Sequence, residues 1–131
     1  MSLKDHLKKL FTIIFEDYPS HYEEILRLAG KRRARITDGK EIIIMSFRNK
    51  KPRIINDIPK VKIPTGRYSK VFLLELIDGQ LCLNEAIKSG LIDCKGKLQE
   101  VLKFWRIVEI IIYVSSRSLR AYKLWDEYKR T

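Results

Sequence analysis

Side chains that could carry out catalysis are few in this chain. Its two histidines, His6 and His21, have no serine or cysteine motif nearby that would pair a nucleophile with a base. The sequence also lacks a glycine-rich phosphate loop, a distinctive pair of carboxylates and a cluster of metal ligands. We therefore expect both histidines on the surface, no enzymatic activity, and no cofactor or metal.

The two cysteines are the remaining reactive side chains. Cys82 and Cys94 match no zinc or Cys-x-x-Cys spacing, and two cysteines cannot make a disulfide framework. Cys82 stands near the start of a predicted helical turn around residues 83–88, where the helix dipole would favour a thiolate. Because no partner base is evident beside it, we expect both thiols to be reduced and structural.

Positive charge is the most prominent feature of the composition. Lys and Arg number 27 against 16 Asp and Glu, a formal net charge of +11, so an anionic surface is attracted at low salt. Two runs without acidic residues carry much of this charge: Arg27, Lys31, Arg32, Arg33 and Arg35, and then Arg48, Lys50, Lys51 and Arg53. They are either solvated faces or a docking surface for an anionic membrane, a nucleic acid or a protein partner.

Length and composition indicate one folded domain spanning residues 1–131. The chain is 45% hydrophobic and 33% charged, which is typical of a folded protein with a packed core. No apolar run approaches the roughly 18 residues that span a bilayer, and the N-terminus alternates charged with apolar residues. We expect a cytoplasmic protein, and the sequence leaves its oligomeric state open, a homodimer included.

The first thirty residues predict two helices. Apolar residues recur at helical spacing from Leu3 to Tyr18, with charged residues on the other faces, and Pro19 ends this amphipathic helix. Ser20 and Glu23 form a capping-box pattern for a second, short helix that Gly30 stops.

From residue 31 the apolar period changes to two, which predicts strands. An Asp-Gly pair at 38–39 indicates a hairpin turn. If Ala34 and Ile36 face the core, a three-residue loop places Ile42 and Ile44 beside them, and a two-residue loop gives another pairing. A short strand around 53–56 and a fourth near 58–63 follow, so that the sheet has one apolar and one basic face.

The second half of the chain predicts mainly helices. Thr65 can cap a helix that runs to Ile77 and is apolar on nearly all sides. Residues 91–95 lie between two glycines and alternate, as a fifth strand does. Two longer helices are expected at about 98–113 and 116–128.

This order of elements indicates an α+β fold: a five-stranded, mostly antiparallel sheet covered on one face by helices, with helices at both ends of the chain. Apolar residues cover about half the circumference of the long helix, whereas packing on a sheet needs only a stripe of roughly 100°. They are Phe104, Trp105, Ile107, Val108, Ile111 and Ile112. The part of this apolar surface that does not pack on the sheet either lines a cavity or is covered by the final helix. The final helix would cover it through Leu119, Tyr122, Trp125 and Tyr128.

The stretch 78–96, DGQLCLNEAIKSGLIDCKG, contains a glycine-ended helix, a short Glu-Ala turn and a Gly-x-apolar-x-apolar-x-Gly strand, and the long helix follows it. It resembles the late part of the sterol carrier protein type 2 family, and the order of the preceding elements is similar too. The resemblance implies a non-catalytic lipid carrier whose sheet and helices enclose an apolar tunnel for a sterol, a fatty acid or an acyl-CoA. It places Phe72, Leu76, Ile92, Phe104, Val108 and Ile112 around the tunnel, with Ile44 and Val61 on its sheet wall.

Two function classes therefore compete. The first is binding or transfer of an apolar ligand, and the second is a basic adaptor on an anionic surface. Nucleic acid is the less favoured surface, because the predicted strands lack the exposed aromatic residues on which bases stack.

Overall fold

A computed structural model describes residues 1–79 and 82–131, with the side chains of residues 71 and 72 outside the described part. The helices are α1 Leu3–Asp17, α2 Pro19–Ala29, α3 Lys70–Ile77, α4 Leu83–Lys88, α5 Leu98–Arg117 and α6 Leu119–Arg130. The strands are β1 Ala34–Thr37, β2 Ile42–Arg48, β3 Lys51–Asn56, β4 Thr65–Tyr68 and β5 Ile92–Lys95. The predicted α+β class is confirmed.

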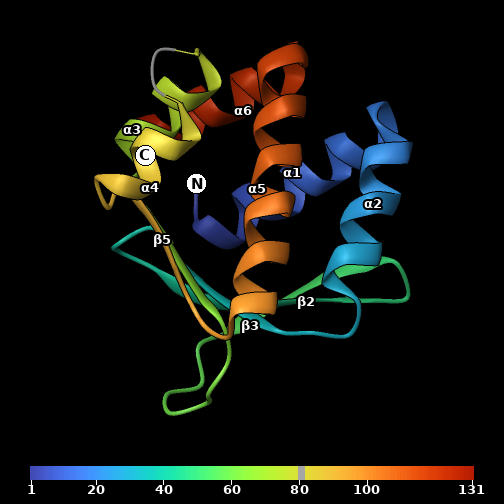
Figure 1. The fold of residues 1–131 in the computed structure, drawn as a ribbon. Coiled ribbons are helices and arrows are strands. Elements are labelled where there is room, and N and C mark those ends of the chain that lie inside the picture. The colour runs from blue at the N-terminus through green and yellow to red at the C-terminus, as the bar shows by residue number, and fades with distance from the viewer. Residues whose placement is uncertain (80–81) are drawn as a thin grey trace.

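The strands form one sheet in the order β3-β2-β1-β4-β5. All neighbouring strands are antiparallel except β1 and β4, which are parallel, so the sheet is mixed but mostly antiparallel, as predicted. The helices lie on one face of this sheet, and α5 crosses the middle of the helical layer (Figure 1). The segment 57–64 projects from the opposite side (Figure 1).

The loop between β1 and β2 sets which side chains face the helices. Its four residues, 38–41, place Met45 beside Ala34 and Ile43 beside Ile36. The loop is longer than either predicted turn because the Asp38 carboxylate accepts hydrogen bonds from the backbone N–H groups of residues 40 and 41, at 3.0 and 2.9 Å. The predicted neighbours Ile42 and Ile44 are therefore wrong.

The strand predicted at 58–63 is also wrong. These residues form an irregular segment, and the fourth strand is Thr65–Tyr68, where a helix was expected to begin. Prolines at 59 and 64 lack the N–H that a strand ladder needs, and Lys60 has a positive φ of 73°. Helix α3 consequently starts only at Lys70, after strand β4 has paired with its two neighbours.

The first turn of α2 differs from the predicted capping box at Ser20 and Glu23. Pro19 is the first helical residue and Tyr18 is the N-cap. Proline suits this position because the N–H that it lacks would have no intrahelical partner. Gly30, with φ 56°, ends the helix as predicted.

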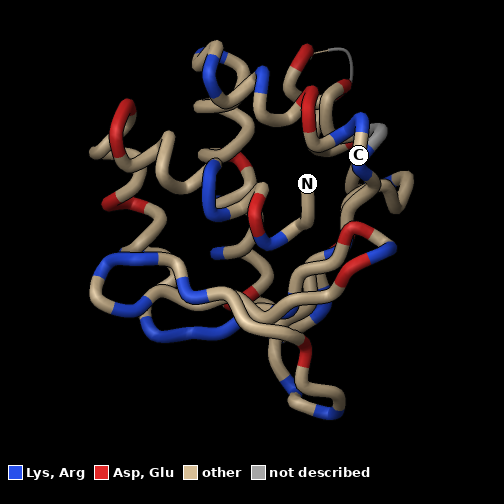
Figure 2. Tube along the Cα trace, turned by 180° about the vertical axis from the view of Figure 1, so that it is seen from behind, with Lys and Arg blue, Asp and Glu red and all other residues tan. Residues whose placement is uncertain are grey.

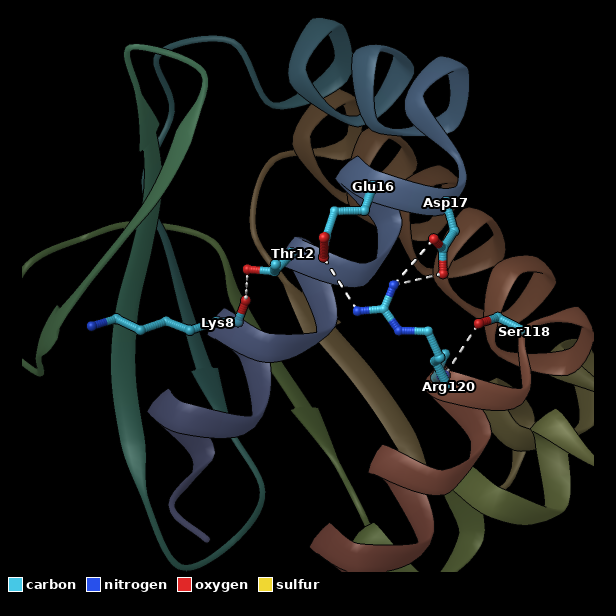
Figure 3. A network of polar contacts seen from close by, with 7 residues as sticks. Lys8, Thr12, Glu16, Asp17, Ser118 and Arg120 are labelled. Carbon is cyan, nitrogen blue, oxygen red and sulfur yellow. Dashed lines mark hydrogen bonds and ion pairs between the residues drawn. The ribbon is translucent and has the colours of Figure 1, made fainter.

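The two ends of the chain pack together in the helical layer. Helix α1 buries Leu3, His6, Leu7, Leu10, Phe11, Ile13 and Ile14, and α6 buries Ala121, Leu124, Trp125 and Tyr128. An exposed ion-pair cluster joins the same helices: Arg120 contacts Asp17 at 3.0 Å and Glu16 at 3.2 Å (Figure 3). In the part of the chain that the structure describes, no helix combines the length and apolarity needed to cross a bilayer.

Candidate ligand cavities between the sheet and the helices

Cavity 1 lies between the helical layer and the β1–β2 part of the sheet. Its volume is about 120 Å³. Apolar side chains dominate its wall, and they include Leu7, Phe11, Leu28, Ala34, Ile36, Met45, Phe47, Phe104, Ile107 and Ile111. Arg32, Arg33, Lys103 and the acidic Glu100 also line it, and because both arginines are exposed, they mark its mouth. The cavity thus combines a mostly apolar interior with two arginines at its mouth.

Cavity 2 lies beside α3 and β5. Its volume is about 80 Å³. Its lining consists of Leu7, Leu10, Ile36, Arg67, Tyr68, Leu73, Ile77, Ile92, Phe104, Val108, Ile111, Ile112 and Trp125. The wall that these residues present is apolar, so this space suits a hydrocarbon group.

Four residues line both cavities. They are Leu7 of α1, Ile36 of β1, and Phe104 and Ile111 of α5. Ile107 belongs to cavity 1 alone, and Val108 to cavity 2 alone. The two spaces therefore lie on either side of α5, with a wall of these shared side chains between them.

The predicted tunnel residues divide into two groups. Phe104, Ile92, Val108 and Ile112 line cavity 2, and Phe104 lines cavity 1 as well. Leu76 is buried in α3 but lines neither cavity. The side chain of Phe72 lies outside the described residues. Ile44 and Val61 are also absent from both linings.

Ile44 is on the wrong face of the sheet for the predicted tunnel wall. It pairs with Arg35, and the guanidinium of Arg35 reaches the segment 57–64. Because side chains alternate along a strand, Ile43 and Met45 face the helices and Ile44 faces this segment, where it is 1% exposed. Val61 belongs to that segment, and its carbonyl accepts a hydrogen bond from Arg35 at 3.0 Å.

Several cavity residues come from the first helix and were absent from the predicted site. Leu7 and Phe11 lie on the apolar face of α1, and Leu7 contributes to both cavities. The helical spacing of their apolar neighbours identifies this face in the sequence, yet spacing does not show which surface the face covers. Ile36 and Met45 were missed because the hairpin register decides which alternate residues face the helices.

A polar cluster lies next to cavity 2. The hydroxyl of Tyr128 donates a hydrogen bond to the Asp38 carboxylate, and the Tyr68 hydroxyl is 3.3 Å from the Tyr128 hydroxyl. The Lys70 ammonium lies 4.3 Å from the centroid of the Tyr128 ring. Burial raises the pKa of both tyrosines, so their hydroxyls remain protonated donors.

His6 is buried within this cluster, so its predicted surface position is wrong. Its ring stacks on Tyr128 with centroids 4.1 Å apart and meets Trp125 edge-on at 4.2 Å. Among the described residues neither ring nitrogen has a hydrogen-bond partner. Burial, reinforced by the positive charge of Lys70, lowers its pKa to about 3. His21 is half-buried against Tyr113, with ring centroids 4.9 Å apart.

The cysteines lie where the sequence predicted, at the N-cap of α4 and in β5. Cys82 is exposed and Cys94 is half-buried. Burial, with the negative charges of Asp93 and Glu100, raises the pKa of Cys94 to about 11, so this thiol is protonated at neutral pH. Within residues 1–79 and 82–131 no group of His, Cys, Asp and Glu has the arrangement of a metal site.

The two basic runs meet on one side of the molecule. The backbone carbonyl of Lys50 accepts a 2.6 Å hydrogen bond from Tyr22, which holds the β2–β3 hairpin beside α2. Arg27 and Lys50 line the same shallow depression. Figure 2 shows Lys and Arg gathered where the end of α2, the following segment and the sheet edge come together. Lys31, Arg32, Arg33, Arg48, Lys51 and Arg53 are exposed there.

Arg35 must be removed from the predicted anionic-surface residues. Its Nε lies 2.7 Å from the Asp57 carboxylate, and its guanidinium donates to the carbonyls of Ile58 and Val61. Its side chain is only 17% exposed. The guanidinium therefore serves to hold the segment 57–64 against the sheet.

Comparisons with known proteins support the architecture. The chain is similar to a structure named UbiJ-SCP2 ubiquinone synthesis protein, with 18% identity and a TM-score of 0.59 over 86% of this chain and 97% of that chain. It is also similar to the sterol carrier protein domain 2 of Helicoverpa armigera, with 15% identity and a TM-score of 0.54 over 83% of this chain and 87% of that one. At these identities the likeness shows the fold, which is that of sterol carrier protein 2. No protein-family profile matches the chain. No curated protein matches it either.

Proposed function

We propose that this chain binds an apolar, lipid-like molecule between its sheet and its helices and carries it without catalysing a reaction. The observation that carries the proposal is the pair of apolar cavities on either side of α5, both within the helix-covered side of the sheet. The structural neighbours add support in general terms, since one is named as a sterol carrier protein domain and another as a ubiquinone synthesis protein.

The energetics of such binding come from burial of hydrocarbon. Each CH₂ group removed from water contributes about 0.8 kcal/mol before ordering costs are subtracted. The wall of cavity 2 offers apolar contacts, and contacts of this kind select for a hydrocarbon shape more than for a headgroup. The ligand class is therefore a sterol, a fatty acid, an acyl-CoA or another long apolar molecule.

The direct test is titration of the delipidated protein with fluorescent acyl chains and with a fluorescent sterol. Saturable binding of one of them is the expected result, and mass spectrometry of molecules that co-purify with the protein would identify the native ligand. If neither probe binds saturably, the proposal is wrong.

The basic surface supports a second, compatible function, which is association with an anionic membrane. Arg32 and Arg33 are exposed at the mouth of cavity 1, and Lys103 lines the same cavity, so a bound membrane would lie next to the opening. A lipid could then pass from the bilayer into the cavity with little exposure to water. A nucleic acid is also negatively charged, but its binding would not account for the apolar cavity behind the basic groups.

Vesicle sedimentation tests whether this basic surface docks on a membrane or whether net positive charge alone causes the association. We expect the protein to associate with phosphatidylglycerol vesicles at low salt and to be released at high salt, because screening weakens the attraction. Replacing Arg32 and Arg33 by Glu should reduce the association. The control makes the same change in net charge by replacing Lys123 and Lys129, two exposed residues of α6, by Glu. Equal losses from both variants would show that net charge alone causes the association.

A further inference from the structure

Cavity 1 and cavity 2 are each small compared with a long lipid chain. Their volumes, about 120 and about 80 Å³, are each below the roughly 300–1,000 Å³ that is usual for ligand pockets. A ligand of lipid length therefore cannot be held in either space alone without displacing side chains. Because the two spaces are separated by only four shared residues, joining them is the shortest route to a longer site.

Phe104 is the largest of these four residues, and its ring lies between α5 and strand β4. Its ring packs against the sheet directly over Gly66 of β4, where a Cβ atom would overlap the ring carbons. Glycine at this position leaves room for the ring between α5 and the sheet. The ring thus fills the gap through which the two cavities would otherwise connect.

Burial or branching at Cβ restricts the other three shared residues more than Phe104. Leu7 is buried in the core, with 5% of its surface exposed. Ile36 and Ile111 are β-branched, which restricts rotation about their first side-chain torsion. Phe104 is half-buried and is not branched at Cβ, so its first side-chain torsion is less restricted.

We propose that Phe104 is a movable partition: in the unloaded protein its ring separates the two cavities, and its displacement joins them into one site for a long chain. Phe104 therefore sets the chain length that the site accepts. This inference rests on the proposed lipid binding and adds a residue that determines ligand specificity.

Chain-length preference provides the test. The delipidated protein would be titrated with octanoate and palmitate by displacement of a fluorescent fatty acid. In Phe104→Ala the long chain no longer has to displace the ring, so the preference for palmitate over octanoate should increase about tenfold, equivalent to about 1.4 kcal/mol. Phe104→Leu, which fills more of the core, should shift the preference in the same direction by less.

Tyr113→Ala is the control, since it also removes an aromatic ring from α5, but at a residue that lines neither cavity and is 41% exposed. Its chain-length preference should equal that of the unmodified protein. If Phe104→Ala and Phe104→Leu also keep that preference, Phe104 is ordinary core packing and the inference is wrong.

A measurement on the unmodified protein avoids any effect of substitution on folding. In the palmitate complex, nuclear Overhauser contacts from the alkyl chain should reach both Met45, which lines cavity 1, and Ile92, which lines cavity 2. Contacts confined to one of the two would overturn the partition while leaving lipid binding intact. Absence of any binding by palmitate, octanoate and a sterol would instead overturn the proposed function.

Discussion

Tyr128 in the last helix donates a hydrogen bond to Asp38 in the first hairpin loop, across 90 residues of sequence. The same carboxylate accepts the two backbone hydrogen bonds that shape this loop. Although burial acts to raise the pKa of Asp38, these three hydrogen bonds and the charge of Lys70 outweigh burial, and the net pKa is lowered. One carboxylate thus joins the C-terminal helix to the turn that sets the register of the sheet.

Removing the hydroxyl of Tyr128 should destabilise the fold. Tyr128→Phe leaves the ring stacked on His6 but deletes the hydrogen bonds to Asp38 and Tyr68. A hydrogen bond to a charged group contributes about 1.5–3 kcal/mol, and we expect the free energy of unfolding to decrease by an amount in this range. Urea denaturation measures the change. Tyr113→Phe, at an exposed residue, is the control and should have little effect.

His6 should make the protein less stable in acid. Its pKa is about 3 in the folded protein, against an ordinary value of 6.5, so the unfolded chain binds more protons between these two pH values. The free energy of unfolding should therefore decrease as the pH falls from 6.5 towards 3, by up to about 1.4 kcal/mol per pH unit.

The variant His6→Phe keeps an aromatic ring between Tyr128 and Trp125 but cannot take up the proton. Its stability should fall less steeply over this pH range than that of the unmodified protein. Asp38, whose lowered pKa acts in the same direction when the pH falls further, is unchanged in the variant. A slope in His6→Phe identical to that of the unmodified protein would contradict the assignment.

Arg35 should behave as a structural residue and not as part of a docking surface. Arg35→Met deletes the ion pair with Asp57 and the hydrogen bonds to the segment 57–64. Because the Asp57 side chain is 23% exposed and remains partly solvated, we expect a loss of about 1–3 kcal/mol of stability. Arg53→Met, on exposed Arg53, removes the same charge as a control. Equal thermal stability of the two variants would refute this role.

Val108→Trp distinguishes a usable cavity from packed core. If the added volume enters cavity 2, binding of acyl chains should weaken at least about tenfold, while the melting temperature changes little. Overpacking of a dense core would instead cost about 1–3 kcal/mol and lower the melting temperature. Leu102→Trp adds an indole to the same helix at a residue that is 59% exposed and should change neither quantity.

Local signals in the sequence predicted most helices well. The apolar period of α1, the glycine after α2 and the pattern of α5 and α6 depend on neighbouring residues, and the structure has these elements within a few residues of the predictions. On α6 the same period was less informative, because Leu119 and Tyr122 are exposed whereas Trp125 and Tyr128 are buried. Periodicity identifies an apolar face, but its outer limits depend on what packs against it.

The sequence by itself determined the α+β class, the amphipathic helices and the apolar residues of α5 that line the cavities, since these follow from local spacing and from burial of apolar surface. Only the tertiary structure decided how the segment 57–64 is held against the sheet, that Ile44 faces away from the helices and that His6 is buried. Each of these depends on a contact between residues distant in the chain: the Arg35 hydrogen bonds, the hairpin register and the packing of α6 on α1. Such contacts leave no periodic pattern in a single sequence, so the position of the cavities became visible only with the fold.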